Sequence, residues 1–591
     1  MKLILSFLAI LSWGLINAQL NISPSTTADS YVYVKDRMFY VQQDIQLSSN
    51  QNEETKASIY LRKEAQLLQG DDSGKKNSGN GLLSIFQEGT SNAYDYNYWA
   101  MPVDNNQDTE NLFGELIFEP VTTTFSRNAK ITSGLDGSSN PLTISNQWIY
   151  KFSGSEYNNW KYVGDHFEVE PGEGFSMKGV NGTNLNIIDG APINSGNSQQ
   201  YDFRGLPNNG TYILEVEKDQ VILVGNPYPS ALNLDQFLFE NTNTTGIAYF
   251  WDSNKEVNSH YLENYEGGYG AYSPGAGIYV PAIFSKYTGN TQHEIGISGE
   301  LYGRKIAPVA QGFMLIGKET GSINFRNSHR VYQKEQKGLS EFKSAKILNT
   351  TSIPYLRLQV EINDMLIRSL VLAFREDATN TVDHAMDAQT LDIAANDTGW
   401  DILNEYYVID VRPLISEEKI PLILHLESAS EMLFRVSEFN HFDPDRIFLY
   451  DALEDLYYPI KASSIKFNLP SGTYKNRFYI SFIDKLPETV TSEIFPVPEE
   501  VPTKPQIILL NTVSIFQNNP LAQLEIKMLY EAEIESLRLY DINGKMILNE
   551  NFKEKRKEFS FSTQNLSTAV YIVKVITTDK KELTKKIRIK N

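Results

Sequence analysis

Period-two alternation of apolar and polar residues constrains the fold of this chain most strongly, and the last 84 residues, 508–591, carry it most clearly. Several short stretches there place apolar side chains on one face and polar ones on the other. The apolar faces are Leu524, Ile526 and Met528; Leu537 and Leu539; Phe559 and Phe561; Tyr571, Val573 and Val575; Ile587 and Ile589. Short strands at this spacing, broken by turn residues, predict a β-sandwich.

Four motifs follow one another in this region: Val513 to Pro520, LYDINGK (539–545), YIVKV (571–575) and the basic ending KKIRIK (585–590). As an ordered set they resemble the type A C-terminal sorting domain, although Asn518 replaces a usual proline and Ala569 a usual glycine. The resemblance implies an immunoglobulin-like sandwich that directs cargo to the type IX secretion machinery of Bacteroidota. The alternative is an ordinary terminal immunoglobulin-like module.

The N-terminus has the pattern of a secretory leader. Lys2 supplies a positive start, residues 3–16 an apolar run, and Ala18 a small residue before a cleavage point at Gln19. This pattern predicts a signal peptide over residues 1–18, with a buried first helix as the alternative. The run is shorter than the ~20 apolar residues of a membrane span, and no later stretch approaches that length. We therefore expect a mature chain without a transmembrane span.

Composition narrows the class of protein. A chain of 591 residues should hold several domains, since single cores stop growing at roughly 250–300 residues. The chain has no cysteine, so neither disulfides nor thiolate metal sites contribute. The net charge of −20 argues against a nucleic-acid partner, which would require basic surfaces. The 33 tyrosines and 30 phenylalanines favour strands.

The sequence pattern in the middle of the chain predicts further β-rich modules. The candidates for helices are short, namely residues 234–240 and the stretch after Asp383. Residues 171–187 and 309–325 share a Gly-Phe, glycine, turn and strand pattern, which suggests a duplication across about 90–200 and 205–330. A Pro- and Glu-rich segment should act as an extended spacer. The expected organisation is a signal peptide (1–18), N-terminal β-rich modules (19–204), a second β-rich module (205–335), a β-sandwich (345–486), a linker (487–507) and the sorting domain (508–591).

A second resemblance covers most of residues 30–485. It rests on SIYLRKEAQLLQ (58–69), YDYNYWAMPV (94–103), LVGNPYPSAL (223–232) and LAFREDATNTVDHAMDA (372–388). These motifs are similar to those of large secreted flavobacterial proteins, usually described as surface or adhesin-like. The resemblance implies an architecture and an extracellular address, and it assigns no chemistry.

A search for catalytic motifs assigns no catalytic, cofactor-binding or metal-binding residue. The seven histidines lack zinc-site spacing, and nucleophile elbows, P-loops and dinucleotide-binding glycine turns are missing from the sequence. Carboxylate pairs of the glycosidase type stay open, because they meet in space and not in sequence. The best acidic loop could bind calcium or be a solvated surface; its residues are Glu376, Asp377, Asp383 and Asp387. A weaker case combines Asp71 and Asp72 with Asn77 and Asn80.

Two segments, 95–103 and 261–280, concentrate tyrosine and tryptophan with glycine. Exposed aromatic faces can bind sugar rings, whereas buried ones would only pack the sheets. The whole sequence predicts an all-β, multidomain protein with β-sandwich-like modules. We expect a non-enzymatic secreted or cell-surface protein of an adhesin or matrix-binding kind, with glycans or other matrix components as further partners. The alternative is a glycan-binding accessory protein or a glycan-degrading enzyme with unrecognised carboxylates.

Overall fold

The computed structural model describes residues 20–70, 76–104, 113–156, 159–196, 198–288, 291–335, 352–364, 366–415, 417–484, 513–518, 523–528, 534–541, 545–556, 558–567, 569–578 and 582–589. The leader and the linker predicted above lie outside these residues. The chain forms two compact units. The larger one extends to Ser430 and adds Ser437–Tyr457 and Leu469–Asp484; the smaller one holds Glu431–Val436, Tyr458–Asn468 and the residues after Asp484.

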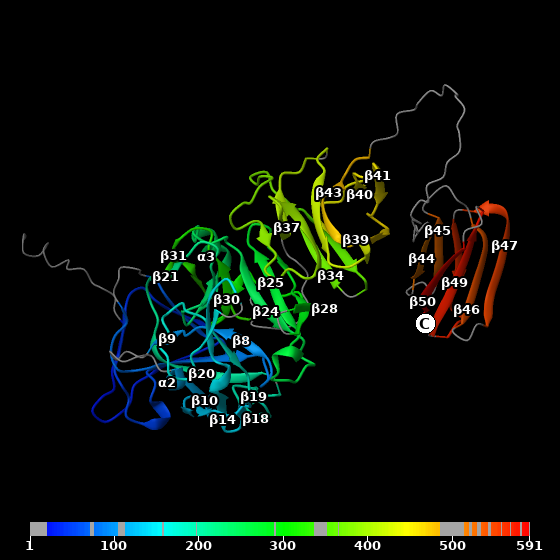
Figure 1. Ribbon diagram of the computed structural model, residues 1–591. Coiled ribbons are helices and arrows are strands. Elements are labelled where there is room, and N and C mark those ends of the chain that lie inside the picture. The colour runs from blue at the N-terminus through cyan, green and yellow to red at the C-terminus, as the bar shows by residue number, and fades with distance from the viewer. Residues whose placement is uncertain are drawn as a thin grey trace, which may run out of the picture. The chain divides into compact units, whose positions relative to one another are not determined.

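Strands dominate both units, which confirms the all-β, multidomain fold class (Figure 1). In the described part of the chain the α-helices are α2 (Phe113–Leu116) and α3 (Leu234–Glu240). Helix α3 was predicted, and the Asn233 side chain caps it by accepting a hydrogen bond from the Gln236 amide at 3.3 Å. The stretch after Asp383 forms turns and no helix.

The first 90 residues contain parallel strand pairs, an arrangement that the sequence pattern did not indicate. Strands β2 (Val32–Lys35), β5 (Ile59–Arg62) and β7 (Leu83–Gly89) pair in parallel. The same holds for β3 (Met38–Val41) with β6 (Gln66–Gln69), and for β1 (Leu20–Ile22) with β4 (Ile45–Leu47). Strand β7 then pairs antiparallel with β20 (Gln199–Pro207), which continues the sheet through β10 (Ile117–Pro120) to β11 (Ser126–Asn128).

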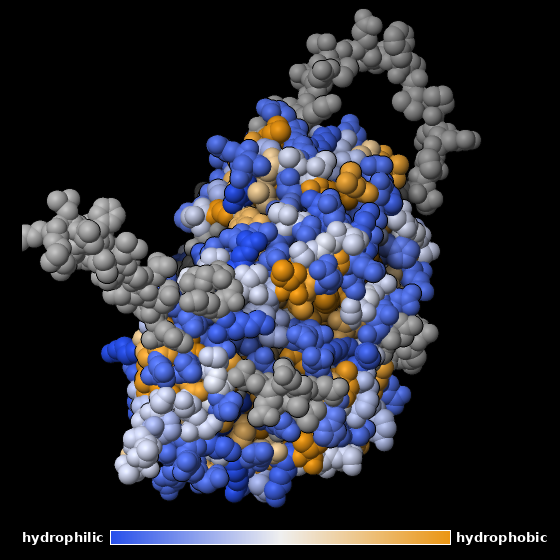
Figure 2. All heavy atoms as spheres, turned by 90° about the vertical axis from the view of Figure 1, so that its left-hand side faces the viewer, coloured by the Kyte–Doolittle hydropathy of each residue, from blue (hydrophilic) through white to orange (hydrophobic). Residues whose placement is uncertain are grey.

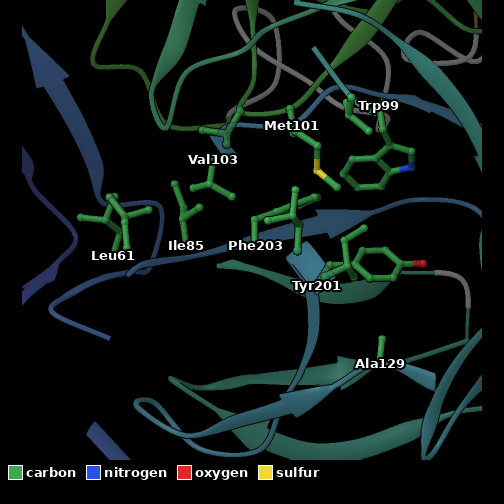
Figure 3. Close-up of a cluster of buried hydrophobic side chains, with 14 of the residues drawn as sticks. Leu61, Ile85, Trp99, Met101, Val103, Ala129, Tyr201 and Phe203 are labelled. Atoms are coloured by element: carbon green, nitrogen blue, oxygen red, sulfur yellow. The ribbon is translucent and has the colours of Figure 1, made fainter. Parts of the chain in front are cut away.

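Buried side chains from these strands form a core that also takes in residues of the next sheet (Figure 3). Trp99 is 1% exposed and packs edge-on against Tyr201, with ring centroids 5.5 Å apart. The labelled members are Leu61, Ile85, Trp99, Met101, Val103, Ala129, Tyr201 and Phe203.

A long sheet joins the two segments that the repeat analysis paired. Its order is β28-β27-β25-β24-β30-β22-β15-β17-β8. The two Gly-Phe motifs lie in β17 and β30, and each of these strands is flanked in the same way: β17 by β8 and β15, β30 by β22 and β24. The two Gly-Phe strands thus have matching neighbours in strand order, and both sets of three strands lie in one sheet. The bounds are β8 Tyr96–Trp99, β15 Tyr150–Gly154, β17 Phe175–Lys178, β22 Val221–Gly225, β24 Ala248–Ser253, β25 Gly267–Ser273, β27 Ile283–Thr288, β28 Thr291–Ser298 and β30 Gly312–Ile316.

The next sheet of the larger unit runs β40-β43-β38-β36-β37-β34-β33, with β35 beside β37. The predicted strand pair 356–362 and 369–374 is the antiparallel hairpin of β33 and β34. The bounds are β33 Tyr355–Ile362, β34 Leu366–Phe374, β35 Ala388–Gln389, β36 Asn396–Ile402, β37 Glu405–Arg412, β38 Ile420–Leu426, β40 Phe448–Asp451 and β43 Gly472–Ser481.

The C-terminal part of the smaller unit is a sandwich of two antiparallel sheets, β44-β45-β48 and β47-β46-β49-β50. Leu524 and Ile526 from one sheet share a core with Leu537, Leu539 and Val573 from the other. Most of the predicted apolar faces are therefore buried, with Phe559 and Phe561 partly buried against this core, and the side chain of Met528 lies outside the described part of the structure. The bounds are β44 Val513–Asn518, β45 Gln523–Met528, β46 Ile534–Asp541, β47 Met546–Arg556, β48 Glu558–Ser562, β49 Ala569–Thr577 and β50 Glu582–Ile589.

Within the described residues no helix has the length and apolar character needed to cross a bilayer. The face drawn in Figure 2 is largely hydrophilic, with hydrophobic side chains in small separate patches. The remaining strands are β9 Val103–Asp104, β12 Lys130–Thr132, β13 Ser138–Ser139, β14 Leu142–Ser145, β16 Trp160–Tyr162, β18 Asn184–Ile188, β19 Ala191–Asn194, β21 Tyr212–Val216, β23 Ala231–Asn233, β26 Ile278–Val280, β29 Ile306–Ala307, β31 Gly321–Phe325, β32 Arg330–Val331, β39 Ser430–Asn440, β41 Leu456–Pro459 and β42 Ser464–Leu469.

Candidate functional site

An aromatic cavity of about 530 Å³ lies in the larger unit, on the long sheet around β8, β15 and β24–β25 (Figure 1). This volume is within the range of roughly 300–1,000 Å³ that is usual for small-molecule sites. Two of its rings, Tyr98 and Phe152, are buried, whereas the other seven are partly exposed. The nine rings are Tyr96, Tyr98, Trp148, Tyr150, Phe152, Trp160, Trp251, Tyr265 and Tyr269.

Strand alternation explains which aromatic residues of the first segment reach the cavity. On β8, Tyr96 and Tyr98 share the face that lines it, while Trp99 faces the core of Figure 3. Tyr98 and Tyr269 join the two walls through a hydrogen bond of 2.7 Å between their hydroxyls. Burial, together with this neighbouring tyrosine, raises the pKa of Tyr98 well above its usual value. The Tyr98 hydroxyl therefore stays neutral and keeps the bond at physiological pH.

The second predicted segment, 261–280, divides in the same way. Tyr265 and Tyr269 line the cavity, but Tyr272 and Tyr279 are 3% and 2% exposed in a separate core. The tyrosines of this segment are thus divided between the cavity and a buried core. The structure brings the two segments together in one cavity, although they are more than 160 residues apart in the sequence.

Lys178 organises one end of the cavity wall without lining it. It is 3% exposed, and its Nζ lies 3.9 Å from the ring centroid of Trp148, 4.7 Å from that of Tyr265 and 5.0 Å from that of Tyr96. The ammonium donates hydrogen bonds to Nδ1 of His260, at 3.1 Å, and to the Tyr265 hydroxyl. Burial lowers the pKa of Lys178 to about 7, against the opposing influence of Asp95 and Asp136.

His260 is held by Lys178 on one side and by Asp136 on the other. Its Nε2 donates to Oδ1 of Asp136 at 2.7 Å, which leaves Nδ1 to accept from the lysine. The imidazole stacks on Trp148 with ring centroids 5.0 Å apart and planes 9° apart, and it also contacts Tyr94 at 4.8 Å. These contacts fix the loop that carries His260 and Tyr265 beside the cavity.

Two carboxylates, Glu156 and Asp392, also line the cavity. Glu156 is exposed in the loop after β15, and Asp392 is half-buried after β35. Burial raises the pKa of Asp392 to about 6, although Arg368 and a hydrogen bond from the Tyr269 amide oppose the change. Beyond the four predicted tyrosines the lining has sixteen residues, and most of these gave no sequence signal, since they come from many separate strands and loops.

The aspartates of the acidic loop are engaged in local hydrogen bonds and an ion pair. Asp377 pairs with Arg375 at 2.7 Å, and Asp383 accepts a hydrogen bond from the Thr379 amide at 2.5 Å. Asp387 accepts from the amides of Asp383 and Val411. Each of these three carboxylates serves a local bond, and Glu376 is exposed. Among the described residues no group of three or more possible ligands could hold a metal ion.

The second, weaker candidate for a calcium site includes Asp71, Asp72 and Asn77. Asp71 and Asp72 lie outside the described residues. Asn77 is 5% exposed and bonds Gln69, the Pro207 carbonyl and the Ile45 amide, so its side chain serves the fold.

Comparison with protein families matches residues 17–482 to the domain of unknown function DUF8693 and residues 503–589 to the domain of unknown function DUF8694. The first match covers well over half of the chain, which therefore belongs to the DUF8693 family. No curated protein matches the chain. The cavity lies wholly within the DUF8693 match.

Proposed function

We propose that this protein is an exported, non-enzymatic glycan-binding protein of the cell surface or matrix, and that its aromatic cavity holds sugar rings. The nine rings that line one cavity carry the proposal. The C–H faces of a sugar pack against aromatic rings, while tyrosine hydroxyls and indole N–H groups bond its hydroxyls. A cavity of about 530 Å³ has room for a short oligosaccharide.

Export is the second part of the proposal. A leader over 1–18 would bring the chain to the periplasm, and the 508–591 sandwich would act as the sorting signal for type IX secretion. The support is the order of the four motifs together with the separate core of the sandwich. The protein would then be secreted or attached to the outer cell surface.

A second candidate is a glycan-degrading enzyme, because two carboxylates line the same cavity. A half-buried acid with a pKa of about 6, as in Asp392, has the protonation behaviour of a general acid, and Glu156 would act as its partner. If the protein is such an enzyme, hydrolysis requires both side chains. A variant that lacks either carboxylate should then still bind the glycan but no longer hydrolyse it.

A glycan array with the purified protein separates these functions. Binding without released sugar after prolonged incubation supports the binding protein. Release of sugar that disappears in Asp392→Asn and Glu156→Gln, while these variants still bind, would establish the enzyme instead. An array with no retained glycan would overturn both.

A further inference from the structure

The charges around the aromatic cavity are not balanced. Among the described residues that line it, the acidic ones are Glu156 and Asp392. The lining contains neither lysine nor arginine. A carboxylate beside an apolar wall interacts more strongly with a ligand's charge than one in open water, because the effective dielectric is lower.

The nearest buried cation, Lys178, is already engaged. Its charge lies against the rings of Trp148, Tyr96 and Tyr265, all of which line the cavity although the lysine does not. Asp95 and Asp136 act on it from neighbouring segments, and Asp136 is also bonded to His260. This end of the cavity therefore offers no open cation to an acidic ligand.

The cation near Asp392, Arg368, is also paired with another carboxylate. Arg368 forms a bidentate pair with the Asp397 carboxylate. With Asp392 it makes a hydrogen bond to the backbone carbonyl, to which Nη2 donates at 3.3 Å. The Asp392 carboxylate accepts from the Tyr269 amide and borders the cavity. It can therefore accept a further donor from a ligand.

We propose that the cavity selects glycans with free, protonated amino groups, and that the ammonium of an amino sugar lies against Asp392 while the rings stack on the aromatic walls. This inference rests on the proposed glycan-binding function. An ammonium donates charge-assisted hydrogen bonds to the carboxylate, which an N-acetylated sugar cannot do. An acidic sugar would meet carboxylates without a compensating cation.

The test measures binding of the purified protein to three oligosaccharides of equal length by calorimetry near neutral pH. These are a β-1,4-linked glucosamine tetramer, the same tetramer fully N-acetylated, and a tetramer of galacturonic acid. We expect the free amine to bind about tenfold more tightly than the acetylated form, and the acidic tetramer to bind more weakly than either. Raising the salt concentration should reduce the preference, because it screens the charges.

Asp392→Asn should remove most of the preference for the amine, so that the affinities of this variant for the free-amine and the acetylated tetramers differ by less than about twofold. Glu156→Gln is a second variant, which shows whether the exposed carboxylate contributes. Equal binding of the amine and acetylated forms, or tighter binding of the acidic tetramer, would overturn the inference while the glycan-binding function stands. If no array glycan and no tetramer binds, the proposed function itself fails.

Discussion

Lys178 shows how one side chain determines the geometry of the candidate site. A lysine that is 3% exposed is uncommon, and here three aromatic rings and one imidazole surround it. Cation–π contacts of this kind contribute about 0.5–2 kcal/mol each. The ammonium therefore orders the rings that line the cavity, although it does not reach the cavity itself.

The lowered pKa of Lys178 predicts a pH dependence of stability. Between about pH 7 and the ordinary lysine pKa near 10, the unfolded chain holds a proton that the folded chain has released. The free energy of unfolding should therefore rise with pH in this window, by at most about 1.4 kcal/mol per unit. Denaturant titrations of the wild type and Lys178→Met measure the effect. The wild type should gain stability relative to the variant from pH 7 to 9.5, and a constant difference would contradict this assignment.

Single residues of the site were predictable only where the sequence concentrates them. Tyr96, Tyr98, Tyr265 and Tyr269 belong to tyrosine-rich segments, and composition identified them. Trp148 and Trp160 lie in another aromatic-rich stretch, 148–162, and Trp251 follows Tyr249 and Phe250, but nothing in the sequence shows that these stretches meet in one sheet. Nothing in the sequence near Lys178 indicates the rings that bury it.

At the scale of elements, local alternation predicted strands well and their partners poorly. The apolar faces of the C-terminal sandwich, the hairpin of β33 and β34 and the short helix α3 agree with the sequence pattern. The parallel pairing of β2, β5 and β7 does not follow from alternation, which is the same for parallel and antiparallel neighbours.

Strand β49 provides a test of which side chains point into the core of the sandwich. Val573 is fully buried, whereas the adjacent Lys574 is half-buried on the other face. A carboxylate at Val573 would lack a partner in the core, and the several kcal/mol that this costs is comparable to the stability of a small domain. Val573→Asp should unfold the sandwich and Lys574→Asp should leave it folded, as followed by its melting transition. Equal melting temperatures for the two variants would show that Val573 does not point into the core.

At the scale of the whole molecule, the cavity and the C-terminal sandwich belong to separate compact units. The walls of the cavity come from strands of both sequence repeats and from the residues after β35, so no short fragment of the chain contains the site. The sandwich has its own core. Binding and export should therefore be separable by mutation.

Deleting residues 508–591 tests that separation in a bacterium with a type IX machinery. The shortened protein should accumulate in the periplasm, since the proposed sorting signal is gone, and should bind glycans as the full chain does. Fractionation and immunoblotting locate it, with the full-length protein as the control. Normal amounts of the shortened protein at the cell surface would rule out the sorting role.

The most direct test of the account is the affinity of the purified protein for its best array glycan, measured by calorimetry for the wild type, Trp160→Ala and Tyr261→Ala. Trp160 lines the cavity against Tyr98 and Phe152, and Tyr261 is 72% exposed on the neighbouring loop and does not line it. Loss of one stacking ring should weaken binding about tenfold, which corresponds to 1.4 kcal/mol. The account predicts this loss in Trp160→Ala, unchanged affinity in Tyr261→Ala and similar melting temperatures for all three proteins; a folded Trp160→Ala that binds as tightly as the wild type would contradict it.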